Sequence, residues 1–205
     1  MEEIGLFPLD MVLLPTELVP LHIFEPRYRE LIDECLELEL EFGLVQADDT
    51  GMRRIGTRAA VVEVLERFED GRLNIVVEGR ERFRIVEMTG GRSFHTAQVE
   101  PFADSETESP AEARARAHAL FARLRELTSS QVEVTGEETA GLAFALAARL
   151  ELPVGLKQEL LELEGEAPRL ERVTTAIDAV VQALVRGQEL ASRARRNGHA
   201  PASGE

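Results

Sequence analysis

The sequence is poor in several residue types, and each shortage excludes a class of protein. One cysteine among 205 residues excludes a fold held together by disulfides. Tryptophan is absent and aromatic residues make up only 5% of the chain, so the sequence lacks the stacking array with which many proteins hold single-stranded nucleic acid. Hydrophobic residues still make up 44% of the chain, which is enough to bury a core without disulfides or metals.

Lysine occurs only once, at Lys157. A phosphate-binding loop needs G-x-x-x-x-G-K-[ST], whereas Lys157 stands in G-L-K-Q with no Ser or Thr after it. Lys157 is also the sole candidate base for a serine–lysine pair, but the leucines around it predict an amphipathic helix on which it faces solvent. We therefore expect no ATP hydrolysis, no peptide cleavage and no cofactor.

Positive charge is scarce as well. Lys and Arg number 23 against 38 Asp and Glu, a formal net charge of −15, which opposes binding to a phosphate backbone. No apolar run approaches the length of a membrane span, and the acidic start Met1–Glu3 lacks the basic region of a signal peptide. These features favour a cytoplasmic protein that binds neither nucleic acid nor membranes.

Prolines, in contrast, crowd the start of the chain, where four of them interrupt short apolar runs between residues 6 and 29. Each proline removes a backbone donor and favours extended geometry in the residue before it. Brief strands are therefore predicted at Leu6–Phe7, Met11–Leu14 and Leu18–Ile23. From Pro26 the apolar residues follow helical spacing, which predicts a helix over Pro26–Leu38.

Turn signals divide the following region into short strands. Asp70-Gly71 predicts a hairpin with strands Ala59–Phe68 and Leu73–Glu78. Several short strands with a single helix favour a closed or nearly closed barrel. Three further features are predicted: a turn at Gly79-Arg80-Glu81, an alternation that buries Phe83 and Ile85 and leaves Arg82 and Arg84 in water, and a last strand over Ser93–Val99.

After Pro101 the composition changes to helix-forming residues. Ser109 and Glu112 are placed to form a capping box around Pro110. A stripe formed by Leu170, Val173, Ile177, Val180, Val181 and Leu184 predicts the core of a helical bundle. Helices are expected near Pro110–Leu127, Glu137–Leu150, Val154–Leu163 and Arg169–Arg195. The predicted domains are a barrel over 1–102, a linker over 103–109, a bundle over 110–195 and a disordered tail over 196–205.

The opening run F-P-L-D-M-V-L-L-P, followed by P-L-H-I-F-E-P-R-Y-R, resembles the amino-terminal, substrate-binding domain of the Lon protease family. Blocks that begin at Ile55 and Glu69, L-K-Q-E-L-L-E-L-E and the R-L-E-R at Arg169 resemble the same domain in the same order, up to about Val185. The resemblance implies an α+β fold in which a small PUA-like β pseudobarrel with one crossing helix precedes a C-terminal α-helical bundle. In the family an ATPase module and a protease domain follow, and neither is found in these 205 residues.

The sequence holds few candidates for chemistry. His22, His95, His118 and His199 have no cysteine or carboxylate partners at ligand spacing, which favours ordinary surface or half-buried histidines over a metal site. Cys35 lies on the apolar stripe of the first helix and should behave as a small core residue. No catalytic or metal-binding residue is therefore assigned.

One polar cluster, Glu25 to Arg29, has two interpretations. In the structural one, which we favour, Glu25 accepts hydrogen bonds at the helix start and the arginines pair with barrel carboxylates. In the functional one, Phe24, Glu25, Arg27 and Tyr28 form a peptide-binding patch with Phe24 and Tyr28 as its apolar rim. Both hold if the helix borders a groove.

Taken with the resemblance, these features predict a non-catalytic module that recognises unfolded or partly folded polypeptides. An adaptor that serves an ATP-dependent protease or a chaperone in trans fits this prediction. The alternative is an RNA-binding PUA-like domain, which would need a basic face built from Arg80, Arg82 and Arg84. The sequence leaves the oligomeric state open.

Overall fold

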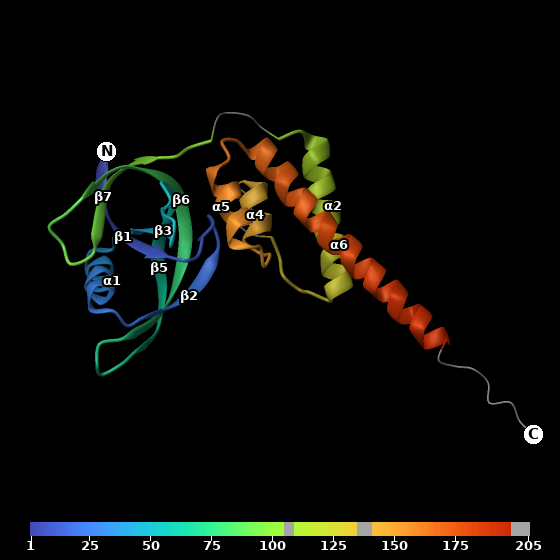
Figure 1. Ribbon diagram of the computed structural model, residues 1–205, viewed down its shortest axis with the longest axis horizontal. Coiled ribbons are helices and arrows are strands. Elements are labelled where there is room, and N and C mark those ends of the chain that lie inside the picture. The colour runs from blue at the N-terminus through green and yellow to red at the C-terminus, as the bar shows by residue number, and fades with distance from the viewer. Residues whose placement is uncertain (105–108, 135–140, 198–205) are drawn as a thin grey trace, which may run out of the picture.

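The computed structural model consists of a β-barrel at one end and a group of helices at the other (Figure 1). It describes residues 1–104, 109–134 and 141–197, with side chains as far as residue 193. The strands are β1 (Glu2–Leu9), β2 (Leu18–Ile23), β3 (Phe42–Asp48), β4 (Gly51–Met52), β5 (Ile55–Arg67), β6 (Leu73–Thr89) and β7 (His95–Pro101). The helices are α1 (Pro26–Leu38), α2 (Ala111–Thr128), α4 (Leu142–Ala147), α5 (Val154–Glu162) and α6 (Glu166–Asn197).

The sheet closes on itself. Its order is β1-β7-β6-β5-β3, and β3 pairs again with β1 in parallel, with Leu6 opposite Gly43. The other pairings along this ring are antiparallel. Closure gives each of the five strands two neighbours, which confirms the barrel predicted from the short strands and turns and the α+β class implied by the resemblance.

Helix α1 covers one side of the barrel with the stripe that its spacing predicted. Tyr28, Leu31, Ile32 and Cys35 are buried and pack among barrel residues such as Phe42. The prediction that Cys35 is a core residue is confirmed, and burial, with a smaller effect of Glu34, raises the pKa of its thiol to about 11.

Two predictions in the barrel are wrong for a shared reason. The Gly79 region is not a turn, because β6 runs through it as one strand, and Met11–Leu14 is not a strand. The loop around Leu14 crosses β6 so closely that a Cβ on Gly79 would lie 2.0 Å from the Leu14 carbonyl oxygen. Gly79 donates to the Glu17 carbonyl oxygen at 2.9 Å, and its own carbonyl accepts from Thr16 at 2.8 Å. Gly79 is needed because any side chain would block the close approach of the Leu14 backbone to β6. From sequence alone, a glycine at this position indicates a turn.

The helices pack around a second core. Helices α2 and α6 lie side by side in Figure 1, and Leu170, Val173, Ile177 and Val181 of the predicted stripe are buried while Val180 is exposed. Ser109 does not cap α2, since its hydroxyl is buried without a hydrogen-bond partner and Pro110 precedes the helix. Helix α4 ends at Ala147, earlier than predicted. Residues 137–140 of that prediction, and 198–205 of the predicted tail, lie outside the described residues.

An ionic cluster joins the barrel to the helices. Asp104 binds both Arg82 of β6 and Arg169 of α6, with Arg169 Nη1 3.0 Å from Asp104 Oδ2. The two guanidinium groups lie over the ring of Phe144, at 5.4 and 4.0 Å from its centroid. Burial opposes ionisation of Asp104, but the hydrogen bond and charge of Arg169 and the charge of Arg82 outweigh it and hold its pKa below the usual range.

Arg82 was predicted to face water, and it is instead buried. It donates to the carbonyl oxygens of Leu161 and Leu163 at 2.7 and 2.9 Å. Burial lowers the pKa of Arg82 to about 10, with a further decrease from neighbouring Arg169. The alternation failed here because the helices cover the face of β6 that would otherwise meet solvent.

Lys157 was also predicted to face water and instead forms an ion pair with Glu17. Glu17 lies next to β2 and also accepts a hydrogen bond from the Leu14 backbone at 2.9 Å. The only lysine of the chain therefore links α5 to the barrel.

Within the described residues, no helix is long and apolar enough to cross a membrane.

Candidate functional site

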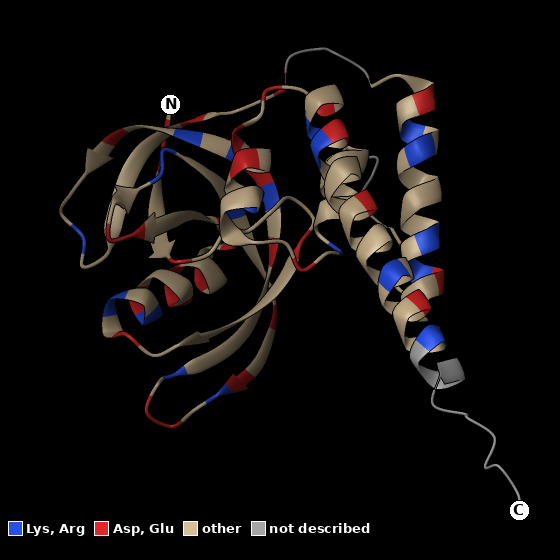
Figure 2. Cartoon of the chain, turned by 45° about the vertical axis from the view of Figure 1, so that its right-hand side comes forward, with Lys and Arg blue, Asp and Glu red and all other residues tan. Residues whose placement is uncertain are grey.

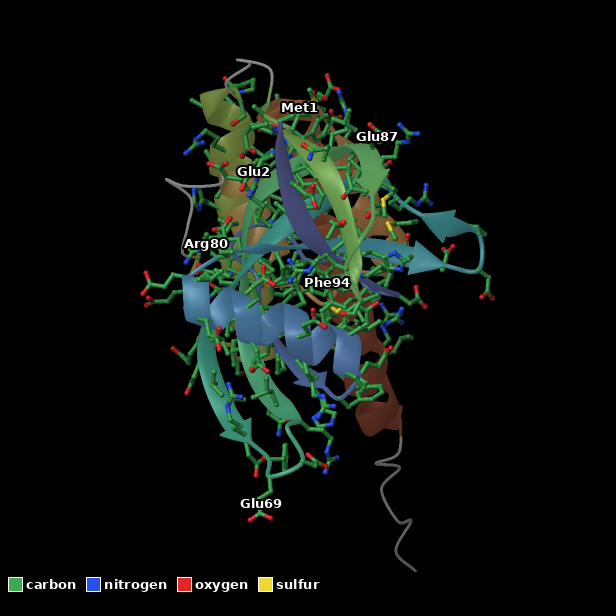
Figure 3. All side chains as sticks on the ribbon, turned by 90° about the vertical axis from the view of Figure 1, so that its left-hand side faces the viewer. Met1, Glu2, Glu69, Arg80, Glu87 and Phe94 are labelled. Atoms are coloured by element: carbon green, nitrogen blue, oxygen red, sulfur yellow. The ribbon has the colours of Figure 1, made fainter. Side chains whose placement is uncertain are left out.

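Three strand segments project beyond the closed part of the barrel and form a small sheet, here called the hairpin lobe. It consists of β2, residues 73–78 of β6 and residues 60–67 of β5. The Asp70-Gly71 turn closes it as predicted: Gly71 has φ +84°, and Phe68 donates to the Arg72 carbonyl at 2.9 Å. Figure 3 shows Glu69 at the tip of this lobe, away from the rest of the barrel.

The lobe has an inner face covered by α1. Leu73, Ile75 and Val77 of β6 point to this side and are completely buried. Arg67 of β5 pairs with Asp33 of α1 at 3.1 Å. Along β6 the inner face therefore belongs to the barrel core, whereas Val64 of β5, opposite Ile75, is 40% exposed.

The outer face is uncovered among the described residues. Residues directly opposite each other in antiparallel strands share a face, so the register places Leu18, Pro20 and His22 of β2 beside Glu78, Val76 and Asn74 of β6. Glu63 and Glu66 of β5 extend the same rows, each beside an irregularity in the β5–β6 register. The outer face is thus mainly apolar along β2 and acidic along β5, and Figure 2 shows acidic residues on this hairpin in red.

An aromatic group lies at the far end of this face. Phe24, directly after β2, is 59% exposed, and its ring stacks on His22 with 5.9 Å between centroids. The rings of His22 and Phe68 pack edge to face with 6.1 Å between their centroids. The guanidinium carbon of Arg72 lies over the Phe68 ring, 4.9 Å from its centroid. We call His22, Phe24 and Phe68 the aromatic patch.

Polar contacts hold the aromatic patch in place. Nδ1 of His22 lies 2.6 Å from Oδ1 of Asn74, whose amide nitrogen donates to Glu66 at 3.0 Å. Both contacts fix side chains on the surface of the lobe. A ligand would therefore meet an ordered surface, which lowers the entropy lost on binding.

The predicted cluster at the start of α1 differs in detail from both of its interpretations. The Glu25 side chain forms no cap, although its backbone carbonyl accepts from Tyr28 and Arg29 at 3.0 Å each. Arg27 pairs with Glu25 itself at 2.8 Å, and Arg29 donates to the backbone carbonyl of Asp70 at 2.5 Å. Among the described residues, neither arginine forms the expected pair with a barrel carboxylate.

Tyr28 is not part of an exposed rim. It is only 3% exposed, and its ring stacks on Phe7 of β1 with 4.0 Å between centroids. Burial raises its pKa. Of the four predicted peptide-binding residues, Phe24 is exposed, Glu25 and Arg27 pair with each other, and Tyr28 is buried under the Arg27 guanidinium.

The histidines are scattered, as their spacing indicated. His22 belongs to the aromatic patch, His95 and His118 are exposed on β7 and α2, and His199 lies outside the described residues. Within the part of the chain that the structure describes, no three His, Cys, Asp or Glu side chains come together as metal ligands.

The outer face of β2, with His22, and the ring of Phe68 were not predicted as part of a site. The signal was present as a period of two, because Leu18, Pro20, His22 and Phe24 alternate with the less exposed residues between them. Phe68 could not be added, since only the hairpin register brings it beside His22.

A cleft adjoins the near end of the same face. It has a volume of about 1120 Å³ and lies between the barrel and the helices, with Leu18, Glu78, Phe102, Phe144 and Arg149 among the residues that line it. Leu18 and Glu78 also belong to the outer face of the lobe. The cleft and the lobe therefore form one continuous surface.

The chain matches the family described as the ATP-dependent protease La (LON) substrate-binding domain over residues 3–179. It is 28% identical to a Lon protease from Paraburkholderia phytofirmans and 27% identical to Lon protease 2 from Syntrophobacter fumaroxidans, over 91% and 95% of this chain. It spans only about a quarter of those relatives, 25% and 26% of their lengths.

Two solved structures share the fold. A Lon N-terminal domain protein from Xanthomonas campestris has a TM-score of 0.66 and 26% identity, covering 85% of this chain and 98% of that one. The N-terminal domain of a Mycobacterium avium complex Lon protease has the same TM-score at 19% identity, covering 86% and 98%.

Proposed function

The chain belongs to the LON substrate-binding domain family, and on this premise we propose that it binds unfolded or partly folded polypeptides without acting on them chemically. The observation that carries the proposal is the uncovered outer face of the hairpin lobe, which ends in the exposed ring of Phe24. Burying apolar surface contributes about 25 cal/mol per Å² before entropic costs. Such a face supports modest affinity for many sequences that expose apolar side chains.

The predicted peptide-binding residues fit this proposal in part. Phe24 supplies apolar contact, and Glu25 with Arg27 lies directly beside it. Tyr28 is buried and stacks on Phe7, so it would support the start of α1 and would not contact a ligand.

The same proposal includes a role as an adaptor for an ATP-dependent protease or a chaperone. It is supported by the matched relatives, which are proteases of which this chain covers one segment. The absence of catalytic activity, the cytoplasmic location and the domain boundaries at 102, 109 and 195 also stay predictions. Asp104, inside the predicted linker, contacts both the barrel and α6.

Nothing observed favours RNA binding. The three arginines that a basic face would need are each engaged: Arg80 pairs with Glu78 at 2.9 Å, Arg82 is buried against Asp104, and Arg84 lies 3.5 Å from Glu100. A surface that binds phosphates needs guanidinium groups that are free to contact them.

The test is binding of the full chain to a permanently unfolded protein such as reduced, carboxymethylated α-lactalbumin. We expect Phe24→Asp to weaken binding about tenfold, the ratio that corresponds to about 1.4 kcal/mol. Val180→Asp, at an exposed apolar position on α6, is the matched control and should bind as the unaltered chain does. Thermal melting must show that both variants fold.

Two results would contradict the proposal. One is equal weakening by Phe24→Asp and Val180→Asp in folded proteins. The other is an absence of binding to unfolded protein combined with tight, steeply salt-dependent binding to single-stranded RNA.

A further inference from the structure

We infer that the cleft between the barrel and the helices is a subsite for a cationic side chain, so that the preferred polypeptides carry arginine or lysine beside an apolar stretch. This inference rests on the proposed function and names the class of segment that it would bind. It concerns a part of the surface that is separate from the aromatic patch.

The size of the cleft suits a stretch of chain. Its volume of about 1120 Å³ exceeds the roughly 300–1,000 Å³ of pockets that enclose small molecules. Part of its wall is apolar, formed by Pro15, Leu18, Pro101, Phe102 and Phe144. An extended polypeptide could bury apolar side chains against this wall.

The charges that line the cleft favour a positively charged ligand. Five carboxylates line it against three guanidinium groups. Each guanidinium group already has an acceptor, namely Glu78 for Arg80, Asp104 for Arg82, and the Thr16 carbonyl oxygen for Arg149. The cleft therefore offers little to an anion.

Two of the carboxylates are available to a cation. Glu41 and Glu81 form no ion pair with any residue that the structure describes, whereas Glu78, Asp104 and Glu166 each pair with an arginine. Beside low-dielectric walls, a free carboxylate attracts a guanidinium or ammonium group more strongly than it would in bulk water. Glu41 and Glu81 are thus the groups expected to hold the cation.

The position of the cleft fixes a spacing along the ligand. Leu18 lines the cleft and Phe24 ends the aromatic patch, and β2 connects the two residues. Six residues of extended chain span about 20 Å. Leu18 lies opposite Glu78, and Glu81 lies three residues further along β6. A polypeptide lying along β2 would therefore present its basic residue about nine positions from an aromatic or large apolar one.

The experiment uses fluorescent peptides and the full chain, with dissociation constants measured by anisotropy. Three peptides share an apolar segment and differ nine positions away, where they carry arginine, neutral citrulline or glutamate. We expect the arginine peptide to bind about fivefold more tightly than the citrulline peptide, and the glutamate peptide to bind most weakly. This fivefold ratio is what about 1 kcal/mol produces.

Variants locate the effect. The double variant Glu41→Gln, Glu81→Gln should lose the preference for arginine while its affinity for the citrulline peptide is unchanged. Glu171→Gln, Glu189→Gln, which removes the same charge from exposed positions on α6, should keep the preference.

The outcomes distinguish a failure of the cationic subsite from a failure of the proposed function. Equal affinity for the arginine and citrulline peptides, or a preference that survives Glu41→Gln, Glu81→Gln, overturns the cationic subsite and leaves polypeptide binding intact. Failure of all three peptides and of unfolded protein to bind overturns the proposed function itself.

Discussion

The barrel is covered on two sides, and the two coverings are built from different interactions. On one side α1 buries an apolar stripe of Tyr28, Leu31, Ile32 and Cys35. On the other, the helical core meets the barrel around Asp104 and its two arginines, whose guanidinium groups both lie over the ring of Phe144. The first contact is made mainly by apolar side chains, with ion pairs such as Arg67–Asp33 at its edge, whereas the second depends on one carboxylate that binds two arginines.

Asp104→Ala should have the largest effect, because it leaves two guanidinium groups without their shared counter-charge. Breaking a buried ion pair costs about 3–5 kcal/mol, and we expect about 3 kcal/mol because the Asp104 side chain is 32% exposed. Urea unfolding measures this loss. Asp49→Ala, at an exposed turn position, should change stability by no more than about 0.5 kcal/mol. A comparably small effect of Asp104→Ala would make the ionic junction irrelevant to stability.

The pH dependence sharpens the same point. The pKa of Asp104 is lower in the folded protein than its ordinary value of 3.8. The stabilisation that ionised Asp104 gives to the fold is therefore fully present above pH 3.8 and is lost as pH falls through the folded pKa. Acid titrations of stability should show a shallower decline for Asp104→Asn than for the unaltered chain, and parallel curves would contradict this origin.

Ile32→Ala tests the apolar covering. Ile32 is fully buried in α1, and removing such a side chain costs about 2–5 kcal/mol. We expect about 2.5 kcal/mol, with the same loss at low and high salt because no charge is involved. Leu38→Ala, exposed at the end of the same helix, is the control and should be nearly neutral. Salt dependence of the Ile32→Ala effect would remove the contrast between the two coverings.

Cys35 is expected to have the smallest effect on stability. Near neutral pH its burial should be detectable only as slow modification of its thiol. With a pKa of about 11, its thiol stays protonated in the folded protein, so a thiol-reactive disulfide reagent should modify it at pH 8 far more slowly than in urea. Because the folded pKa is above the ordinary value of 9.0, stability should also fall as pH rises from about 9 to about 11. Rapid modification of the folded chain would show that α1 opens easily.

The distance in sequence between contacting residues explains what the sequence could predict. The bounds of α1 and β2 follow from proline positions and local spacing, and the hairpin turn follows from Asp70-Gly71. The roles of Lys157 and Arg82 could not be found in this way, because their partners lie 140 and 79 positions away in the chain. Amphipathic patterns identify which side of an element is polar, but not whether another element covers that side.

The candidate site was predictable to a similar degree. Phe24 is exposed as expected, whereas Tyr28 is buried because its stacking partner Phe7 lies on another strand. The acidic part of the face required the β5–β6 register, which contains irregularities that no local pattern indicates.

These irregularities and Pro20 bear on how a polypeptide would be held and released under the proposed function. An uneven strand and a strand interrupted by proline are poor templates for adding another strand by backbone hydrogen bonds. Side chains would supply most of the contact, and the lobe would not convert its client into part of a growing sheet. A surface that displays apolar groups to unfolded protein can thereby avoid seeding the aggregation that such proteins are prone to.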